Sequence, residues 1–269
     1  MRIALVDSGI GMLSTAAALR AARPDADLYL SMDPDHMPWG RRTPDQVIRR
    51  ALAGADTAAR AAAEDGGDLD AVVVPCNTAS VHGLGALRAE FEPRIPVIGT
   101  VPAIKPAAAA GTPIAVWSTE VTTRSAYQRG LVENFAKGVE VTPVACVGLA
   151  EAVESADPGR IAEAVEYAAG LTPPQVRGVV LGCTHYDLVG TRISEALGGR
   201  ATLFTAADAV AAQALRRIGA MERPAGGSGR VRVSASGRPA HLPAEALTYP
   251  AGRALSDEAS ASRTFRDLR

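Results

Sequence analysis

Two stretches of the chain, VVVPCNTAS at residues 72–80 and VVLGCTHYD at residues 179–187, share one layout. Each is an apolar run of strand length that passes through a single proline or glycine to a cysteine, with a threonine within two residues after it. Short apolar runs alternate with long Ala-, Leu-, Arg- and Glu-rich segments along most of the chain, which is typical of an α/β fold. The repeat therefore predicts two similar α/β halves. Each half would present a cysteine at the carboxyl end of a buried strand, where open α/β sheets bind their ligands.

The composition limits the classes of protein to which the chain can belong. With 269 residues, 47% of them hydrophobic and 21% charged, the chain can bury a core and form one large domain or two smaller ones. A formal net charge of −1 argues against a nucleic-acid or anionic-lipid binder. The N-terminal MRIALVDSG lacks the pattern of a signal peptide, and no apolar stretch is long enough to span a bilayer. We therefore expect a soluble cytoplasmic protein without nucleic-acid or membrane partners.

The three cysteines, Cys76, Cys146 and Cys183, are odd in number and have no CxxC spacing. Both facts disfavour a disulfide framework and a structural zinc site. Cys146 ends the segment VTPVAC, which offers it no polar neighbour, and we interpret it as a buried and inert thiol.

We expect two lobes followed by a tail. Residues 1–98, completed by about 207–249, would form an N-terminal α/β lobe, and residues 99–206 a second α/β lobe. Residues 250–269 are rich in Ala, Ser, Arg and Asp without clear periodicity, which predicts a flexible tail. Strands are expected at residues 3–6, 28–31, 71–74, 97–98, 114–117, 139–143, 179–181, 202–204 and 231–236, and helices at residues 13–23, 44–64, 83–92, 125–135, 160–169 and 208–218. Thr43 is expected to cap the helix that begins at Pro44.

Two thiols at strand ends suggest a specific chemistry. A thiol at a helix N-terminus gains thiolate character from the nearby backbone N–H groups. If two such thiols faced each other across a cleft, one could remove a proton from a carbon and the other return a proton to the opposite face, inverting the centre without a cofactor. Asn77, Thr78 and Thr184 are candidate donors to a substrate carboxylate. His185 and Asp7 are the titratable groups expected to assist Cys183 and Cys76, respectively.

Other kinds of site are compatible with the same residues. Cys183, His185 and Cys76 could be metal ligands, although a C-x-H arrangement is unusual. Cys183 and His185 could form a hydrolase dyad, which leaves the second strand-end cysteine unexplained. The sequence Gly9-Ile10-Gly11 only weakly suggests a dinucleotide loop, because a serine occupies the position of the third glycine.

Seven motifs in order along the chain resemble the cofactor-independent aspartate/glutamate racemase family, and the resemblance runs from about residue 2 to residue 218. They are VDSGIG (6–11), PWG (38–40), PCNTAS (75–80), PVIGTVPAIKPA (96–107), STEVTTRSAY (118–127), CVGLAEAVE (146–154) and LGCTHYDLV (181–189). The resemblance implies two pseudo-symmetric, doubly wound lobes with the active site in the cleft between them. It also implies the interconversion of L- and D-glutamate by two cysteines, without metal or cofactor. The expected setting is a homodimer that supplies D-glutamate for peptidoglycan.

The resemblance also assigns roles to residues. Cys76 would act on the D-enantiomer and Cys183 on the L-enantiomer. Asp7 and His185 would assist these thiols, and Glu154 matches a further acidic position near His185. The matching substrate-contact positions are Ser8, Trp39, Gly40, Asn77, Thr78, Thr119, Thr122 and Thr184.

Four departures from the family pattern concern the substrate more than the reaction. Met12 replaces a glycine, Trp39 replaces a tyrosine, Arg41-Arg42 replaces an acidic-plus-basic pair, and Trp117-Ser118 replaces a small, glycine-containing stretch. A related substrate therefore stays open: aspartate, a hydantoin or a specialised-metabolite precursor. A further alternative is a catalytically weak relative that acts as a binding protein.

Overall fold

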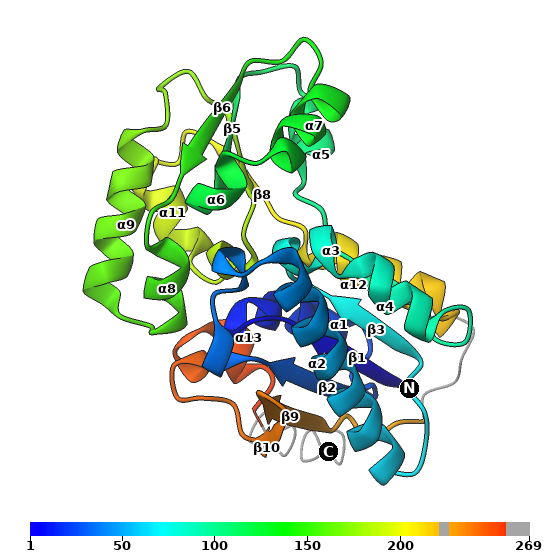
Figure 1. The fold of residues 1–269 in the computed structure, drawn as a ribbon. Coiled ribbons are helices and arrows are strands. Elements are labelled where there is room, and N and C mark those ends of the chain that lie inside the picture. The colour runs from blue at the N-terminus through cyan, green and yellow to red at the C-terminus, as the bar shows by residue number, and fades with distance from the viewer. Residues whose placement is uncertain (221–225, 257–269) are drawn as a thin grey trace, which may run out of the picture. The chain divides into compact units, whose positions relative to one another are not determined.

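The computed structural model describes residues 1–220 and 226–256, which form two compact units (Figure 1). Unit 1 consists of Met1–Thr100 together with the described residues from Ala207 onward. Unit 2 is the continuous stretch Val101–Ala206. The first division falls at Thr100, where the sequence suggested residue 98, and the second falls at Ala206.

Unit 1 is built on a six-stranded sheet of order β10-β9-β2-β1-β3-β4. All its neighbouring strands are parallel except the β9–β10 pair. The central strands are continuous apolar runs because helices cover both faces of the sheet. The strands are β1 (Arg2–Val6), β2 (Asp27–Met32), β3 (Ala71–Val74), β4 (Val97–Gly99), β9 (Val231–Ala235) and β10 (Arg238–Ala240).

The longest helix of unit 1, α2 (Pro44–Glu64), packs on β1 and β2. As expected, Thr43 caps it: the Thr43 hydroxyl accepts from the Gln46 N–H, and the Gln46 side chain accepts from the Thr43 N–H. The remaining helices of unit 1 are η1 (Ile10–Met12), α1 (Leu13–Ala22), η2 (Pro34–His36), η3 (Trp39–Arg41), α3 (Asn77–His82), α4 (Leu84–Phe91), α12 (Ala207–Arg217), η5 (Ala246–Thr248) and α13 (Pro250–Arg253).

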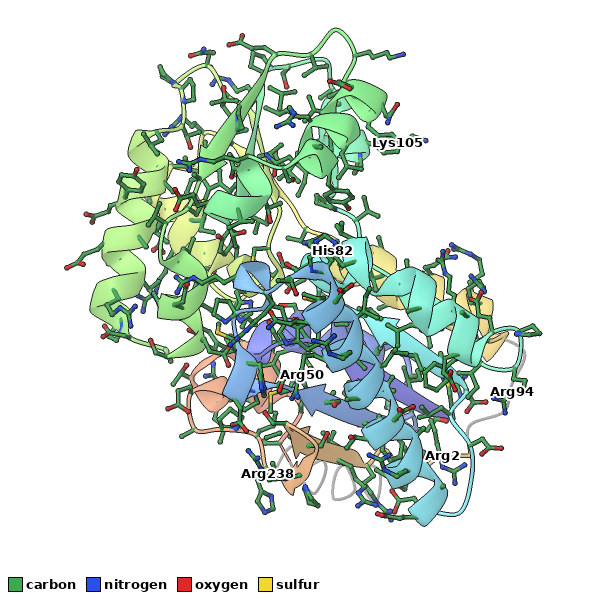
Figure 2. The ribbon with its side chains drawn as sticks, viewed as in Figure 1. Arg2, Arg50, His82, Arg94, Lys105 and Arg238 are labelled. Atoms are coloured by element: carbon green, nitrogen blue, oxygen red, sulfur yellow. The ribbon has the colours of Figure 1, made fainter. Side chains whose placement is uncertain are left out.

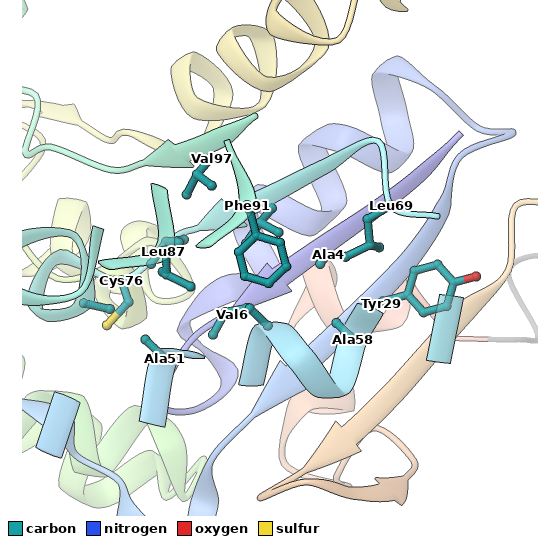
Figure 3. Close-up of a cluster of buried hydrophobic side chains, with 14 of the residues drawn as sticks. Ala4, Val6, Tyr29, Ala51, Ala58, Leu69, Cys76, Leu87, Phe91 and Val97 are labelled. Atoms are coloured by element: carbon teal, nitrogen blue, oxygen red, sulfur yellow. The ribbon is translucent and has the colours of Figure 1, made fainter. Parts of the chain in front are cut away.

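The core between α2 and the sheet reaches the carboxyl end of β3 (Figure 3). Val6, Ala51 and Ala58 lie in this cluster, together with Phe91 of α4. Cys76 belongs to the same cluster and is only 7% exposed. Side chains packed to interior density have little freedom to shift. The backbone that carries the Cys76 thiol is therefore held by the core.

The expected tail from residue 250 is wrong for residues 250–256. This segment forms α13, which contacts α1, and Leu255 is buried. A Cβ on Gly252 would clash with the Ala246 carbonyl oxygen, so this segment passes close to η5. A one-turn helix with one large apolar residue is too short to show periodicity, and only its tertiary contacts order it. Residues 257–269 lie outside the described part of the chain.

Unit 2 is a smaller α/β unit with a parallel sheet of order β6-β5-β7-β8. Its core contains Ile104, Ile114, Val116 and Val180. Its strands are β5 (Ile114–Ser118), β6 (Val141–Ala145), β7 (Gly178–Leu181) and β8 (Thr202–Phe204). Its helices are α5 (Ile104–Ala108), α6 (Glu120–Thr123), α7 (Ala126–Phe135), α8 (Leu149–Glu154), α9 (Pro158–Gly170), α10 (Thr184–Asp187) and α11 (Gly190–Ala196).

The two units share one strand order. In each, the first strand lies between the second and the third, and the fourth pairs with the third: β2-β1-β3-β4 in unit 1 and β6-β5-β7-β8 in unit 2. Cys76 follows β3 and Cys183 follows β7, so each thiol comes after the third strand of its unit. The predicted α/β fold with two similar halves is confirmed.

Candidate active site

In unit 1, the first strand ends at a buried acidic turn. Asp7 follows β1 directly, and both Asp7 and Ser8 are buried. The Ser8 N–H donates to Asp7 Oδ1 at 2.6 Å, and the Ser8 hydroxyl lies 3.3 Å from the same oxygen. Because β1 pairs with β3, this carboxylate and the Cys76 thiol lie at the carboxyl ends of neighbouring strands.

Cys76 lies between β3 and α3, directly before the first residue of α3. Its backbone is extended, and its carbonyl accepts the Ser80 N–H at 2.8 Å. Asn77 and Thr78 form the first turn of α3 and are half-buried. The Cys76 thiol and these two polar side chains thus come from one β–α turn, as the sequence predicts.

The PWG segment lies against the same turn. A Cβ placed on Gly40 would be 3.8 Å from the Thr78 hydroxyl, so this glycine and the first turn of α3 are neighbours. The Trp39 indole does not extend into solvent: it is buried, and its Nε1–H donates to Asp33 Oδ2 at 2.9 Å. The indole that distinguishes this chain is therefore bound to a carboxylate of its own unit.

Asp33 is a buried residue of this region that the sequence interpretation missed. It follows β2 and accepts hydrogen bonds from Trp39, Arg50 and Ser236. Burial alone would raise the pKa of Asp33, but hydrogen bonds from Arg50, Trp39, Ser236 and His36 outweigh it and lower that pKa to about 2. Its place at the end of a strand, like that of Asp7, was a local signal, but its partners Arg50 and Ser236 lie far along the chain.

Three side chains of unit 2 form a continuous chain of contacts. Cys183 Sγ lies 3.8 Å from His185 Nδ1, and His185 Nε2 lies 2.7 Å from Glu154 Oε2. His185 is buried, which disfavours its charged form, but its contacts with Cys183 and Glu154 raise its pKa well above the usual value. The structure thus brings together the three residues that the sequence assigns to this half of the site.

Gly182 allows Cys183 to come close to the neighbouring strand. The Gly182 N–H donates to the Trp117 carbonyl at 2.7 Å, and a Cβ at this position would lie 2.8 Å from the same oxygen. Side chains almost never approach a carbonyl so closely, so the turn before Cys183 requires glycine. Pro75 occupies the equivalent position before Cys76.

The hydroxyls expected to contact substrate in unit 2 come from two turns. Thr119 directly precedes α6, and its hydroxyl lies 2.9 Å from the hydroxyl of Thr122. Thr184 is the first residue of α10 and is half-buried. The neighbouring Ser118 is fully buried and donates to Gln128 Oε1 at 2.7 Å, so its hydroxyl has a structural partner.

Three residues that the sequence singled out lie in the interior. Trp117 is 0% exposed, and its indole N–H donates to the Thr172 hydroxyl at 2.9 Å. This departure from the family pattern is therefore part of the packing of unit 2. Cys146 is buried as predicted, and burial raises the pKa of its thiol far above the usual value. Met12 is also completely buried.

Within residues 1–220 and 226–256, no group of three or more His, Cys, Asp and Glu side chains is arranged to hold a metal ion. None of the helices in the same residues is both long enough and apolar enough to cross a membrane.

Comparison with known proteins agrees with the motifs. A family profile described as Asp/Glu/Hydantoin racemase matches residues 9–229. The glutamate racemase of Methylococcus capsulatus is 36% identical to the chain over 221 residues, which cover 80% of this chain and 79% of that protein. The glutamate racemase of Herpetosiphon aurantiacus is 33% identical over 248 residues, 89% of this chain and 94% of that protein.

Solved structures are similar as well. The crystal structure of Escherichia coli glutamate racemase in complex with L-glutamate and the activator UDP-MurNAc-Ala superimposes with a TM-score of 0.73. Its sequence is 28% identical, and the match covers 81% of this chain and 82% of that chain. The family resemblance inferred from the motifs is confirmed: the chain belongs to the Asp/Glu/Hydantoin racemase family.

Proposed function

We propose that this protein is an isomerase that interconverts L- and D-glutamate without a cofactor, with Cys76 and Cys183 as its two acid–base groups. The observation that carries the proposal is the contact chain from the Cys183 thiol through His185 to Glu154. Cys183 follows the third strand of unit 2, and Cys76 occupies the equivalent position in unit 1. Relatives named glutamate racemase over most of the chain support glutamate as the substrate.

The proposed reaction moves one proton at each face of Cα. With L-glutamate, the Cys183 thiolate takes the α-proton, and the electron pair of the C–H bond passes into the substrate carboxylate. The Cys76 thiol then gives its proton to the opposite face of Cα. Each turnover exchanges the protonation states of the two thiols, and D-glutamate is converted by the reverse sequence. His185 would assist Cys183 through the contact between its Nδ1 and the Cys183 sulfur at 3.8 Å.

The other site residues would bind and orient the substrate. Asp7 would assist Cys76 from the neighbouring strand end. As the α-proton leaves, negative charge builds up on the substrate carboxylate. Hydrogen-bond donors that are already in position stabilise this charge best. The proposed donors are the hydroxyls, the amide and the backbone N–H groups of Ser8, Gly40, Asn77, Thr78, Thr119, Thr122 and Thr184. Trp39 would contact the substrate through its ring or its backbone, since its indole N–H is bound to Asp33.

We further propose the physiological setting that the family resemblance implies. The protein would act in the cytoplasm as a homodimer and supply D-glutamate for peptidoglycan.

The proposal is tested by incubating the purified protein with each enantiomer of glutamate in D2O without pyridoxal phosphate. We expect deuterium at Cα and loss of optical activity from either side, undiminished by a chelator. Exchange with aspartate or a hydantoin but not with glutamate would indicate a related racemase. If no candidate substrate exchanges, the protein is a binding protein and the proposal fails.

Cysteine variants test the two-base mechanism separately. Cys76→Ser and Cys183→Ser should each abolish racemisation. Cys146→Ser is the matched control: it removes a buried thiol outside the proposed site and should keep the activity. If either of the first two variants racemised glutamate at the normal rate, the two-base assignment would be wrong.

A further inference from the structure

Three separate segments of unit 1 donate hydrogen bonds to the carboxylate of Asp33. Arg50 Nε of α2 donates to Oδ2 at 2.7 Å, and a second guanidinium nitrogen of Arg50 donates to Oδ1. Trp39 Nε1 donates to Oδ2 at 2.9 Å, and the Ser236 hydroxyl, after β9, donates to Oδ1 at 2.9 Å. Figure 2 shows Arg50 at the carboxyl end of the unit 1 strands, whereas Arg2 lies at their amino end.

This carboxylate stays charged in the interior because its donors are fixed. Its side chain is 6% exposed, and its pKa is held at about 2 against the effect of burial. A buried charge is tolerated only while its partners keep their geometry, and a bidentate guanidinium contact leaves little freedom. The Trp39 indole, which donates to the same carboxylate, is therefore held in one place by the Asp33–Arg50 pair.

Asp33 connects two of the three segments of unit 1 that supply proposed substrate contacts. Its backbone N–H donates to the Ser8 carbonyl at 3.2 Å, which ties it to the Asp7–Ser8 turn. Its side chain holds Trp39, and the adjacent Gly40 lies against Thr78. Asp7, Asp33, Trp39 and Arg50 also line one cavity of about 80 Å³.

We propose that Asp33, fixed by Arg50, is a positioning residue that holds the Trp39–Gly40 segment in the conformation that binds substrate. This inference rests on the proposed racemase function and adds a residue to it. The thiols follow β3 and β7. The Asp33 side chain instead bonds to Trp39, to Arg50 of α2 and to Ser236 after β9. Loss of the Asp33 carboxylate therefore acts on substrate binding rather than on proton transfer.

Steady-state kinetics of Asp33→Asn in the full chain test the inference. We expect KM for both enantiomers of glutamate to rise about tenfold or more, as loss of a charge-assisted hydrogen bond implies, while kcat changes by less than about threefold. Trp39→Phe keeps an aromatic ring but removes the indole donor, and it should raise KM in the same way. This second variant keeps the test decisive if Asp33→Asn does not fold.

Asp25→Asn is the matched control. Asp25 precedes β2, whereas Asp33 follows it, and it too is paired with an arginine, Arg23, at 2.9 Å. If the effect of Asp33→Asn were only a general weakening of unit 1, Asp25→Asn would raise KM equally. An unchanged KM in Asp33→Asn, or an equal rise in Asp25→Asn, overturns the inference.

The indole N–H signals of ¹⁵N-labelled protein give a readout that is independent of activity. The chain has two tryptophans, and Trp39→Phe identifies the signal of Trp39. Asp33→Asn should shift that signal and leave the signal of Trp117, which is bound to Thr172 in unit 2, in place. An unshifted Trp39 signal contradicts the inference. Failure of the proposed function would be seen in a different experiment, the D2O exchange assay, in which the wild-type protein would exchange no α-proton of glutamate.

Discussion

His185 Nε2 lies 2.7 Å from Glu154 Oε2, although the two residues are 31 positions apart and belong to different helices, α10 and α8. The contact fixes the plane of the imidazole and directs its other nitrogen, Nδ1, toward the Cys183 sulfur at 3.8 Å. A histidine oriented in this way by a carboxylate is a common device for setting both its tautomer and its pKa. Glu154 is thus linked to Cys183 through His185.

Replacing Glu154 should slow the reaction without removing a thiol. In Glu154→Gln, the imidazole loses a charged acceptor, and the pKa of His185 falls toward its usual value. We expect racemisation of both enantiomers to slow by about 10- to 100-fold, since one charge-assisted hydrogen bond contributes roughly 1.5–3 kcal/mol. Chiral chromatography of timed reactions measures the rate. Glu163→Gln, at an exposed position of α9, is the control and should react normally. Equal rates for the two variants would exclude a role for Glu154.

Stability should fall as the pH rises above the usual pKa of histidine. The pKa of His185 is raised well above 6.5 in the folded protein by its contacts with Cys183 and Glu154, which outweigh burial. Between 6.5 and the raised pKa the folded state binds more protons than the unfolded state, so the free energy of unfolding decreases with pH. The contribution of His185 is fully present below pH 6.5 and is lost as the pH passes the raised pKa.

Urea unfolding at a series of pH values measures this dependence. His185→Asn should flatten the curve in that pH range. If the variant kept the full pH dependence of the wild type, another group would be its source.

Gly182 should not tolerate a side chain. An alanine Cβ at this position would meet the Trp117 carbonyl oxygen at 2.8 Å and Ser118 Cβ at 3.2 Å, so the backbone before Cys183 must move. We expect Gly182→Ala to unfold more easily by roughly 1–3 kcal/mol and to lose most of its activity. Gly190→Ala is the control, because its Cβ would make only an ordinary contact, 3.7 Å from Leu203. A fully active Gly182→Ala would show that the position of Cys183 does not depend on a glycine before it.

Thr172→Val should separate stability from catalysis. The substitution keeps the shape of the side chain but removes the acceptor of the buried Trp117 indole N–H. An unsatisfied buried donor costs roughly 1–3 kcal/mol. The denaturant midpoint should therefore decrease, while KM and kcat measured well below the unfolding temperature stay at wild-type values. A raised KM would instead indicate that Trp117 influences the substrate site.

The sequence predicts most of the fold because its strongest signals are local. The apolar runs before Cys76 and Cys183 form buried strands, and the Thr43 cap starts α2 as expected. The Cys183–His185 pair follows from neighbouring residues and Glu154 from the family resemblance, and the structure places the three in contact.

Long-range contacts explain what the sequence did not predict. Asp33 stands out because Arg50 of α2 and Ser236, which is 203 positions away, donate hydrogen bonds to its carboxylate. A local sequence pattern cannot predict that these residues are in contact. The short helix α13 is likewise ordered by its packing on α1. The role of Trp39 could not be deduced from its residue type, because the direction of its indole depends on Asp33.

The division of the chain has a consequence for its synthesis. Unit 2 is one uninterrupted stretch, whereas unit 1 is made of two stretches that flank it. Domains fold as units as they leave the ribosome. The stretch that contains Cys183, His185 and Glu154 is therefore complete while β2 still lacks its neighbour β9. Until β9 is made, the nascent chain exposes the open edge of β2, and exposed edge strands promote aggregation. Unit 1 therefore begins to emerge from the ribosome before unit 2 but is completed after it.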